Sequence, residues 1–216
     1  MGEEQLSIAV DNAGTVTAMR IRTDGAAWTF VYAPGAGSRL DDPFGVYACR
    51  ALAERGLTCV RFQFPYMEAG RRSPDRPAVL QAAWRAVIDA ARPGRGKLVV
   101  GGRSMGGRVA SQVVARGVNV DALALFAYPL HPPGKPQQTR DEHLPSIAVR
   151  ALFCSGTNDA FASPDELRAT ATKMKRASVH LLEGADHGFA VRKSSGRSRE
   201  DVYAEAVDAM ARWLKV

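Results

Sequence analysis

The sequence has little of what marks secreted, membrane-spanning or metal-binding proteins. Its 216 residues include three cysteines, with no CxxC pair and no metal-ligand spacing of cysteine and histidine, which argues against a disulfide framework and a zinc module. No apolar run approaches the ~20 residues that a membrane-spanning helix needs. The N-terminal segment MGEEQLSIAV is acidic, unlike a signal peptide. We therefore expect a cytoplasmic protein with no membrane partner and no metal.

Charge of one sign is not concentrated in the sequence either. The formal net charge is +7, but the basic residues are scattered, and only residues 192–199 (RKSSGRSR) form a cluster. A solvated loop before the last helix explains this cluster, and no nucleic-acid-binding motif accompanies it. We expect no nucleic-acid partner. With 46% hydrophobic residues, the chain suits one compact domain, which we place over residues 1–216.

Short apolar runs alternate with longer amphipathic ones along the chain. Two alternating segments, 6–10 and 16–21, predict an N-terminal hairpin. The strands expected after it are 28–33, 58–64, 97–101, 121–128, 150–154 and 178–182, with Cys59 and Cys154 buried in two of them. The expected helices are 43–56, 74–91, 105–116, 164–175 and 199–214. This order predicts an α/β fold with a mostly parallel, doubly wound sheet and helices on both faces.

The segment Gly102-Arg103-Ser104-Met105-Gly106 has the form G-x-S-x-G. It follows the expected strand 97–101 directly and opens the next helix. This strand–turn–helix setting is typical of a nucleophile elbow, which projects a serine hydroxyl from the carboxyl edge of the sheet. The alternative is a glycine-rich helix start with a capping serine. We predict that Ser104 is a nucleophile.

A serine hydroxyl needs a base to become a nucleophile near neutral pH. His187 lies in the small-residue segment GADHG, after the last expected strand, where a loop can carry its ring back over the sheet edge. We predict that His187 is the base. The other histidines are His180, within a strand, and His131 and His143, in the proline-rich loop 129–146, where they could touch substrate.

The acid that orients the base is predicted to be Asp159, which follows the strand 150–154 in the segment SGTND. Asp186 is its rival, but side chains adjacent in sequence rarely face each other, and a turn residue is the alternative for Asp159. An oxyanion needs preorganised donors. We predict the backbone N–H groups of Met105 and of Ala36, the latter in the glycine-rich turn 34–38.

Several arginines lie near the expected catalytic edge. Arg103 and Arg108 flank Ser104, and Arg61, Arg71 and Arg72 surround the end of the strand 58–64. They could bind an anionic substrate group through paired N–H donors, or they could be structural or surface charges. We name Arg103 and His131 as candidate substrate contacts.

Seven segments carry a resemblance to known proteins: GAG at 35–37, DDPF at 41–44, RFQFPYM at 61–67, GGRSMGGR at 101–108, YPLHPPGKP at 128–136, GTNDAF at 156–161 and GADHGF at 184–189. With them the sequence resembles the α/β-hydrolase superfamily, in its small dienelactone-hydrolase-like branch. It is similar to predicted bacterial hydrolases related to testis-expressed protein 30 and to subunit 3 of the NSL acetyltransferase complex. The resemblance implies a single-domain α/β-hydrolase fold and a Ser104–Asp159–His187 triad.

The sequence departs from this pattern in two places. Pro34 stands before Gly35 where such proteins usually have histidine. The geometry around the second oxyanion donor can therefore differ from theirs, while the backbone N–H groups of the turn remain. Dienelactone hydrolases proper have cysteine where this chain has Ser104, so their substrate is not carried over.

The function expected from these residues is that of a carboxylesterase-like serine hydrolase acting on a small-molecule ester through an acyl-enzyme, with no cofactor. The alternative is a catalytically silent interaction protein with the same fold. Only the loop 129–146 is available as a cap, so we expect a small, open pocket that suits short acyl groups. We expect a monomer or a homodimer.

Overall fold

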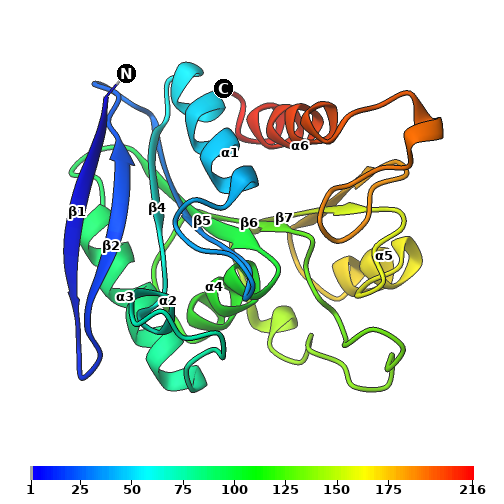
Figure 1. Cartoon of the computed structure of the whole chain (residues 1–216), viewed down its shortest axis with the longest axis horizontal. Coiled ribbons are helices and arrows are strands. Elements are labelled where there is room, and N and C mark those ends of the chain that lie inside the picture. The colour runs from blue at the N-terminus through cyan, green and yellow to red at the C-terminus, as the bar shows by residue number, and fades with distance from the viewer. Residues whose placement is uncertain (1) are drawn as a thin grey trace.

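The structure, a computed structural model, describes residues 2–216 and is built around one eight-stranded sheet (Figure 1). The strands are β1 (Glu3–Val10), β2 (Gly14–Ile21), β3 (Trp28–Ala33), β4 (Thr58–Phe62), β5 (Lys97–Arg103), β6 (Ala122–Phe126), β7 (Arg150–Gly156) and β8 (Ala177–Leu182). The helices are α1 (Pro43–Glu54), α2 (Pro65–Glu68), α3 (Pro77–Ala91), α4 (Met105–Ala115), α5 (Pro164–Thr172) and α6 (Arg199–Leu214). Two short 3₁₀ turns, η1 (Leu144–Ser146) and η2 (Lys193–Ser195), lie in loops.

The strand order is β1-β2-β4-β3-β5-β6-β7-β8. β1 and β2 form the predicted antiparallel hairpin, and β2 pairs antiparallel with β4. Every pairing from β4 to β8 is parallel, which confirms the predicted mostly parallel sheet. The chain moves outward from β3 to β4 and then returns to β5 on the other side of β3. Ligands of open α/β sheets bind where the winding direction reverses in this way, beyond the carboxyl ends of the strands.

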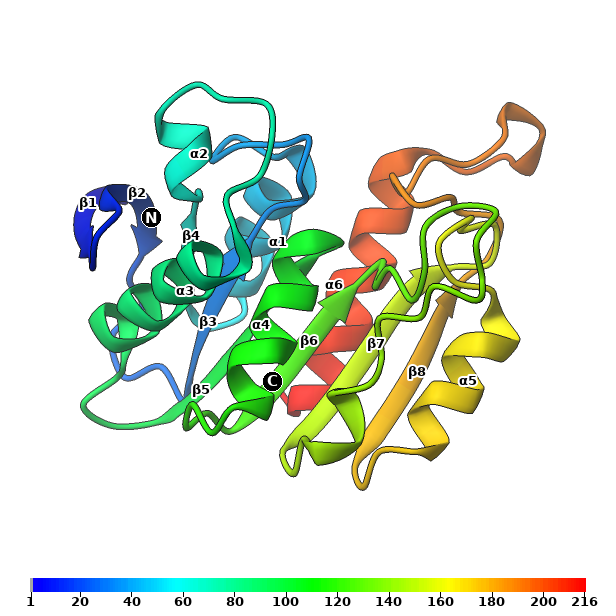
Figure 2. The ribbon, with the colours of Figure 1, turned by 90° about the horizontal axis from the view of Figure 1, so that it is seen from below.

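Helices cover both faces of the sheet because the central strands are apolar on both sides. In β5, Leu98 and Val100 join one buried cluster and Val99 joins the other. α3, α4 and α5 pack on the first face, and α1 and α6 pack on the second (Figures 1 and 2). Such two-sided burial is typical of parallel strands between helices. The predicted doubly wound architecture is therefore confirmed.

The elements differ from their predicted bounds mainly at their ends. α3 begins at Pro77 rather than at residue 74, with Pro77 in the first turn, where a missing N–H costs no helical hydrogen bond. The short helix α2 was not predicted, and it also begins with a proline, Pro65. Among residues 129–146, all of which the structure describes, the one helical turn is η1. β5 extends to Arg103, so the strand runs up to Ser104 itself.

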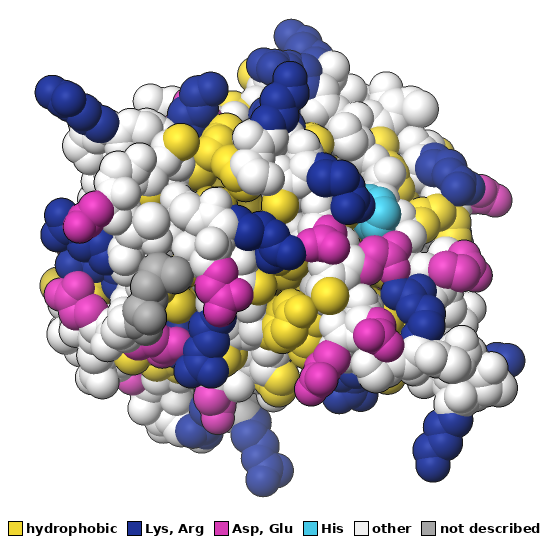
Figure 3. Space-filling model, turned by 90° about the horizontal axis from the view of Figure 1, so that it is seen from above, with side chains coloured by type: hydrophobic (Ala, Val, Ile, Leu, Met, Phe, Trp, Pro, Cys, Tyr) yellow, Lys and Arg dark blue, Asp and Glu magenta, His cyan; other side chains and the backbone are white. Residues whose placement is uncertain are grey.

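The surface over α1 and α6 carries charges of both signs (Figure 3). Lys and Arg side chains are spread over this face, with Asp and Glu side chains between them. Within residues 2–216, none of the helices combines the length and the apolar character that crossing a lipid bilayer requires. Cys59 and Cys154 are buried in β4 and β7, as predicted.

Candidate active site

Ser104 lies on a strained turn between β5 and α4. Its φ of 52° and ψ of −118° lie in a region that side-chain-bearing residues rarely adopt. The neighbouring strand β6 fixes this turn, because the Ser104 N–H donates to the carbonyl of Phe126, its last residue, at 2.9 Å. A Cβ at Gly102 or at Gly106 would lie 2.1 Å from the Ala33 carbonyl oxygen, so both positions require glycine. The strained turn exposes the hydroxyl at the carboxyl edge of the sheet.

The structure brings Ser104, His187 and Asp159 together from three separate loops. His187 Nε2 lies 2.8 Å from Ser104 Oγ, and His187 Nδ1 lies 2.8 Å and 3.0 Å from the two Asp159 carboxylate oxygens. The Asp159 side chain is fully buried, and its carboxylate also accepts the Phe161 N–H at 2.8 Å. With Nδ1–H donated to Asp159, the Nε2 lone pair faces the serine hydroxyl, which is the tautomer that a general base requires.

The rival acid, Asp186, makes a turn rather than a contact with the imidazole. Its Oδ1 accepts the N–H groups of Gly188 and Ala190, each at 2.8 Å. The turn continues into Phe189, which is buried and packs edge-on against Phe44 at a ring distance of 4.9 Å. Asp186 and Phe189 thus anchor the loop on either side of His187.

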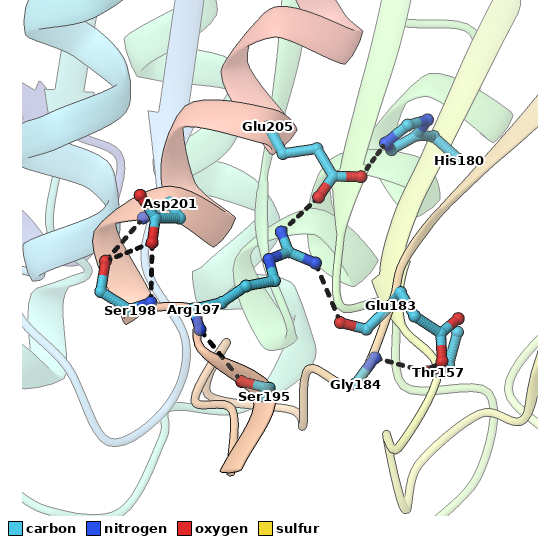
Figure 4. Close-up of polar contacts among 9 residues, drawn as sticks. All are labelled: Thr157, His180, Glu183, Gly184, Ser195, Arg197, Ser198, Asp201 and Glu205. Carbon is cyan, nitrogen blue, oxygen red and sulfur yellow. Dashed lines mark hydrogen bonds and ion pairs between the residues drawn. The ribbon is translucent and has the colours of Figure 1, made fainter. Parts of the chain in front are cut away.

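A second set of polar contacts ties down both ends of the His187 loop (Figure 4). Arg197 donates to the Glu183 carbonyl at 3.1 Å and also pairs with Glu205 of α6. Glu205 in turn contacts His180 Nε2 at 3.0 Å. Thr157 Oγ1 accepts the Gly184 N–H at 2.8 Å, which links this loop to the one that carries Asp159. We name Arg197, Glu205 and the Glu183 carbonyl the loop clamp.

The aromatic ring of Phe161 is a neighbour of the base that the sequence reasoning did not assign. It stacks on the His187 imidazole with centroids 4.0 Å apart and planes 27° apart. Phe161 lies two residues after Asp159, within the segment GTNDAF. The loop that supplies the acid therefore also supplies one wall for the imidazole, and this signal was present in the sequence as an aromatic beside the acid.

The predicted oxyanion donors lie beside Ser104. Ala36 and Met105 line the same cleft as Ser104, and neither backbone N–H has a hydrogen-bond acceptor within residues 2–216. The turn that carries Ala36 is closed by a bond from the Ser38 N–H to the Gly35 carbonyl at 3.1 Å. Tyr66 Oη donates to the Ala36 carbonyl at 2.8 Å. Both N–H groups are free to donate, although Pro34 replaces the usual histidine.

Arg103 lines the cleft, but its guanidinium is bound from behind. Nη2 donates to Asp42 Oδ1 at 2.8 Å and to Ser38 Oγ at 3.0 Å. Asp42 is buried, and its other oxygen accepts Tyr32 Oη at 2.6 Å and the Gly45 N–H at 3.0 Å, as the N-cap of α1. Burial acts to lower the pKa of Arg103, but the charge and hydrogen bond of Asp42, together with the nearby Tyr32 and Tyr203, outweigh it and the pKa is raised. Arg103 therefore has a structural role, since it connects the Ser104 turn to the glycine-rich turn through Ser38 and to the start of α1 through Asp42.

His131, the other predicted substrate contact, is not brought to the cleft. The ring is buried, with Nδ1 2.8 Å from the Pro132 carbonyl and Nε2 3.3 Å from a Glu166 carboxylate oxygen. Glu166 belongs to the capping box that begins α5. Both ring nitrogens are therefore already engaged, and His131 fastens the loop 129–146 to α5.

The cleft over Ser104 has a volume of about 540 Å³. Its further lining residues are Pro74, Arg108, Pro129, Arg140 and Phe161. The loop 129–146 contributes only two of these, which fits the predicted minimal cap. A hollow of about 620 Å³ lies at the opposite end of the parallel strands, near Thr29 and Gly96, and holds none of the three residues described above. Within residues 2–216, no three His, Cys, Asp or Glu side chains are grouped to hold a metal ion.

Comparison with known proteins assigns the chain to a family. The model of the α/β-hydrolase domain family matches residues 26–215. An α/β serine hydrolase without a lid from Xanthomonas campestris superposes with a TM-score of 0.74 at 20% identity, covering 99% of this chain and 95% of that one. An α/β serine hydrolase homologue from Coxiella burnetii gives 0.74 at 21% identity over 98% and 99%.

A third structure, a putative α/β hydrolase from Agrobacterium tumefaciens, gives a TM-score of 0.77 at 18% identity, covering 99% of this chain and 97% of that one. At these identities the three structures establish a shared fold. Because the family model spans nearly the whole chain from β3 to the end of α6, the protein belongs to the α/β-hydrolase domain family.

Proposed function

We propose that this protein is a carboxylesterase-like serine hydrolase that cleaves a small ester through an acyl-enzyme. The observation that carries the proposal is the continuous chain from Ser104 Oγ to His187 Nε2 at 2.8 Å and from His187 Nδ1 to Asp159 at 2.8 Å. Three side chains separated by 28 and 83 residues along the chain meet in the geometry that acyl transfer needs.

In the first half of the reaction, Ser104 Oγ attacks the ester carbonyl carbon while His187 Nε2 accepts the hydroxyl proton. The carbonyl oxygen becomes an oxyanion, which the free N–H groups of Met105 and Ala36 stabilise. Asp159 holds the Nδ1–H and stabilises the imidazolium. The tetrahedral intermediate collapses, the carbon–oxygen bond to the alcohol breaks, and His187 Nε2–H protonates the departing alkoxide. The acyl group remains on Ser104.

In the second half, water replaces the alcohol. His187 Nε2 removes a proton from water as its oxygen attacks the acyl carbonyl carbon, and the same two N–H groups hold the oxyanion. Collapse releases the carboxylic acid, and the proton on His187 returns to Ser104 Oγ. The reaction consumes one ester and one water, and it restores the enzyme.

The open cleft supports a short or soluble acyl group as substrate. No helical cap covers Ser104 within residues 2–216, and the loop 129–146 reaches the cleft only through Pro129 and Arg140. A long acyl chain would find little apolar surface to cover it. We also propose that the chain belongs with the predicted bacterial hydrolases related to testis-expressed protein 30 and NSL complex subunit 3, on segments such as GGRSMGGR, and that it acts in the cytoplasm.

A fluorophosphonate probe tests the proposal directly. Wild-type protein should be labelled, with the adduct mapped to Ser104, and Ser104→Ala should abolish labelling and lower ester hydrolysis by about 10⁴-fold or more. Ser178→Ala, an exposed serine on β8, is the matched control and should label normally. The values of kcat/KM for p-nitrophenyl esters from acetate to octanoate would then show which acyl chain length the enzyme prefers.

The contrary outcome is equally clear. Folded wild-type protein that neither labels nor hydrolyses any of these esters would contradict the proposal and favour a silent interaction protein that keeps the fold.

A further inference from the structure

Three arginines line the cleft over Ser104, and only one of them has an acidic partner. Arg103 is bound to Asp42 at 2.8 Å, whereas Arg108 and Arg140 form no ion pair and no side-chain hydrogen bond within residues 2–216. No aspartate or glutamate is among the residues that line this cleft. Two positive charges therefore stand beside the nucleophile without compensation from the protein.

Part of the Arg108 guanidinium is buried without a partner, as is Nε of Arg103, but Arg103 has Asp42 to balance its charge and Arg108 has no acidic partner within residues 2–216. Arg108 lies in the first turn of α4, four residues after Ser104, and its Nε is shielded from solvent with no acceptor within hydrogen-bonding distance. Burial lowers the pKa of Arg108, and the nearby Arg140 charge lowers it further. Arginine nevertheless stays protonated in proteins. A buried, charged donor without an acceptor is unfavourable, and an anion in the cleft would relieve it.

Arg140 is held at the cleft by its backbone. Its N–H donates to the Leu130 carbonyl at 2.8 Å, and its carbonyl accepts Tyr128 Oη at 3.0 Å. Tyr128 is buried at the end of β6, so these bonds connect Arg140 to the sheet. Because the backbone of Arg140 is already fixed, no backbone ordering is needed when its side chain binds a ligand.

The titratable neighbours of the two arginines do not neutralise them. Asp141 is directed to Lys173, with an oxygen–nitrogen distance of 3.3 Å. His143 contacts Ser111 Oγ at 2.7 Å, and burial together with the Arg108 charge lowers its pKa to about 4, so the ring is neutral near pH 7. The charges of Arg108 and Arg140 therefore stay unneutralised by Asp141 and His143 and are open to a ligand.

We propose that Arg108 and Arg140 form an anion subsite and that the ester hydrolysed here carries a carboxylate on one side of its scissile bond. This inference rests on the proposed function, and it specifies the substrate class. Planar guanidinium groups match carboxylate oxygens through paired N–H donors, and such charge-assisted bonds are stronger than neutral ones. The carboxylate holds the ester in place while its carbonyl carbon lies over Ser104.

Matched ester pairs test the subsite. The acyl-side pair is p-nitrophenyl hemiglutarate and p-nitrophenyl pentanoate. The alcohol-side pair is the butyrate esters of 4-hydroxybenzoate and of 4-methylphenol. In at least one pair, wild-type kcat/KM should favour the carboxylated ester by about tenfold or more, and Arg108→Met or Arg140→Met should bring that ratio to about one. Arg85→Met removes an exposed arginine of α3 outside the cleft and should leave the ratio unchanged.

The preference should also weaken as salt is added, since partly exposed charges are screened. If wild-type protein labels with fluorophosphonate but both ratios are near one, or if the ratios survive in Arg108→Met and Arg140→Met, the subsite is wrong while the hydrolase proposal stands. Circular dichroism spectra that match wild type would confirm that the variants are folded.

A binding measurement covers the case in which Ser104 is not a nucleophile. If no labelling occurs, titration calorimetry with glutarate decides, because binding needs no turnover. Glutarate binding that Arg108→Met weakens about tenfold or more supports the subsite. Equal binding by wild type, Arg108→Met and Arg140→Met, or no binding by wild type at millimolar glutarate, overturns it.

Discussion

Two loops border the cleft, and they are built in contrasting ways. The segment 183–198, which carries His187, is fixed at both ends by the loop clamp and in the middle by the buried Phe189. The segment 129–146, which carries Arg140, is anchored at its ends by buried Leu130 and Leu144, while residues 133–139 are all exposed. Proton transfer tolerates little displacement, whereas substrate selection does not need a rigid loop tip. His187 therefore lies in a loop fixed at its ends and its middle, whereas Arg140 lies at the anchored base of a loop whose tip is exposed.

The largest effect should come from breaking the contact that orients His187 in the fixed loop. Asp159→Asn removes the negative charge and favours the wrong imidazole tautomer, so kcat should fall by about 10⁴-fold while the fold is kept. Asp165→Asn, which alters an exposed acid on α5, is the matched control and should change kcat little. Initial rates with a short p-nitrophenyl ester measure both. An Asp159→Asn enzyme of near wild-type rate would mean that the base is oriented by something else.

The next effect concerns the anchor of the His187 loop. Phe189→Ala empties a fully buried site against Phe44 and Tyr203, and should lower the free energy of unfolding by about 3–5 kcal/mol. Gln137→Ala, at the exposed tip of the opposite loop, should stay within about 0.5 kcal/mol of wild type. Urea unfolding gives both values. Equal sensitivity of the two positions would remove the contrast between the loops.

The loop clamp should have a smaller effect, expressed more in rate than in stability. Arg197→Ala frees the Glu183 carbonyl and Glu205, so His187 should sample positions away from Ser104 and kcat should fall by about tenfold. Arg192→Ala changes an exposed arginine of the same segment whose side chain makes no hydrogen bond within residues 2–216. Its kcat should match wild type. Losses of equal size in both variants would point to charge rather than to loop position.

The smallest effect is the pH dependence of the loop 129–146. Burial and the Arg108 charge lower the folded-state pKa of His143 from 6.5 to about 4. Folding therefore favours the neutral imidazole over the protonated one. The unfolded chain binds the proton near pH 6.5, and stability is therefore full above that pH and falls as the pH drops towards 4. Since the ring is partly exposed, we expect a loss of about 1 kcal/mol.

His143→Gln keeps a side chain that can bond Ser111 but cannot titrate in this range. Its unfolding free energy should change less than that of wild type between pH 7 and pH 4.5 by about the same 1 kcal/mol. Parallel curves for the two proteins would show that folding does not lower the pKa of His143, so the ring would become protonated below about pH 6.5 beside Arg108.

Sequence patterns predicted the fold well because they report local constraints. Runs such as LVV and ALALF are apolar on both sides, which suits strands covered by helices on two faces, and glycine on either side of Ser104 marks close backbone approach. The chain order of serine, aspartate and histidine followed from which loops meet at one sheet edge. These features depend on neighbours along the chain or on topology.

The partners of long side chains could not be predicted in the same way. Arg103 and Arg108 look equivalent in the string GGRSMGGR, but one ends β5 and the other lies in the first turn of α4. The strand end turns Arg103 towards Asp42, which is 61 residues away in sequence, and the helix leaves Arg108 facing the cleft. Likewise, His131 was expected to touch substrate, yet Glu166 of α5 lies against it. Only tertiary packing decides such pairings.

The Ala33 carbonyl oxygen lies between the turn that carries Ser104 and the glycine-rich turn that carries Ala36, and it limits how close the two turns can come. Gly102 and Gly106, which bracket Ser104, both approach this oxygen, and the glycine-rich turn with Ala36 begins at the very next residue. An added methyl group at either glycine would push the nucleophile and the Ala36 N–H apart. A larger side chain at either glycine therefore requires the Ser104 turn and the glycine-rich turn to shift together.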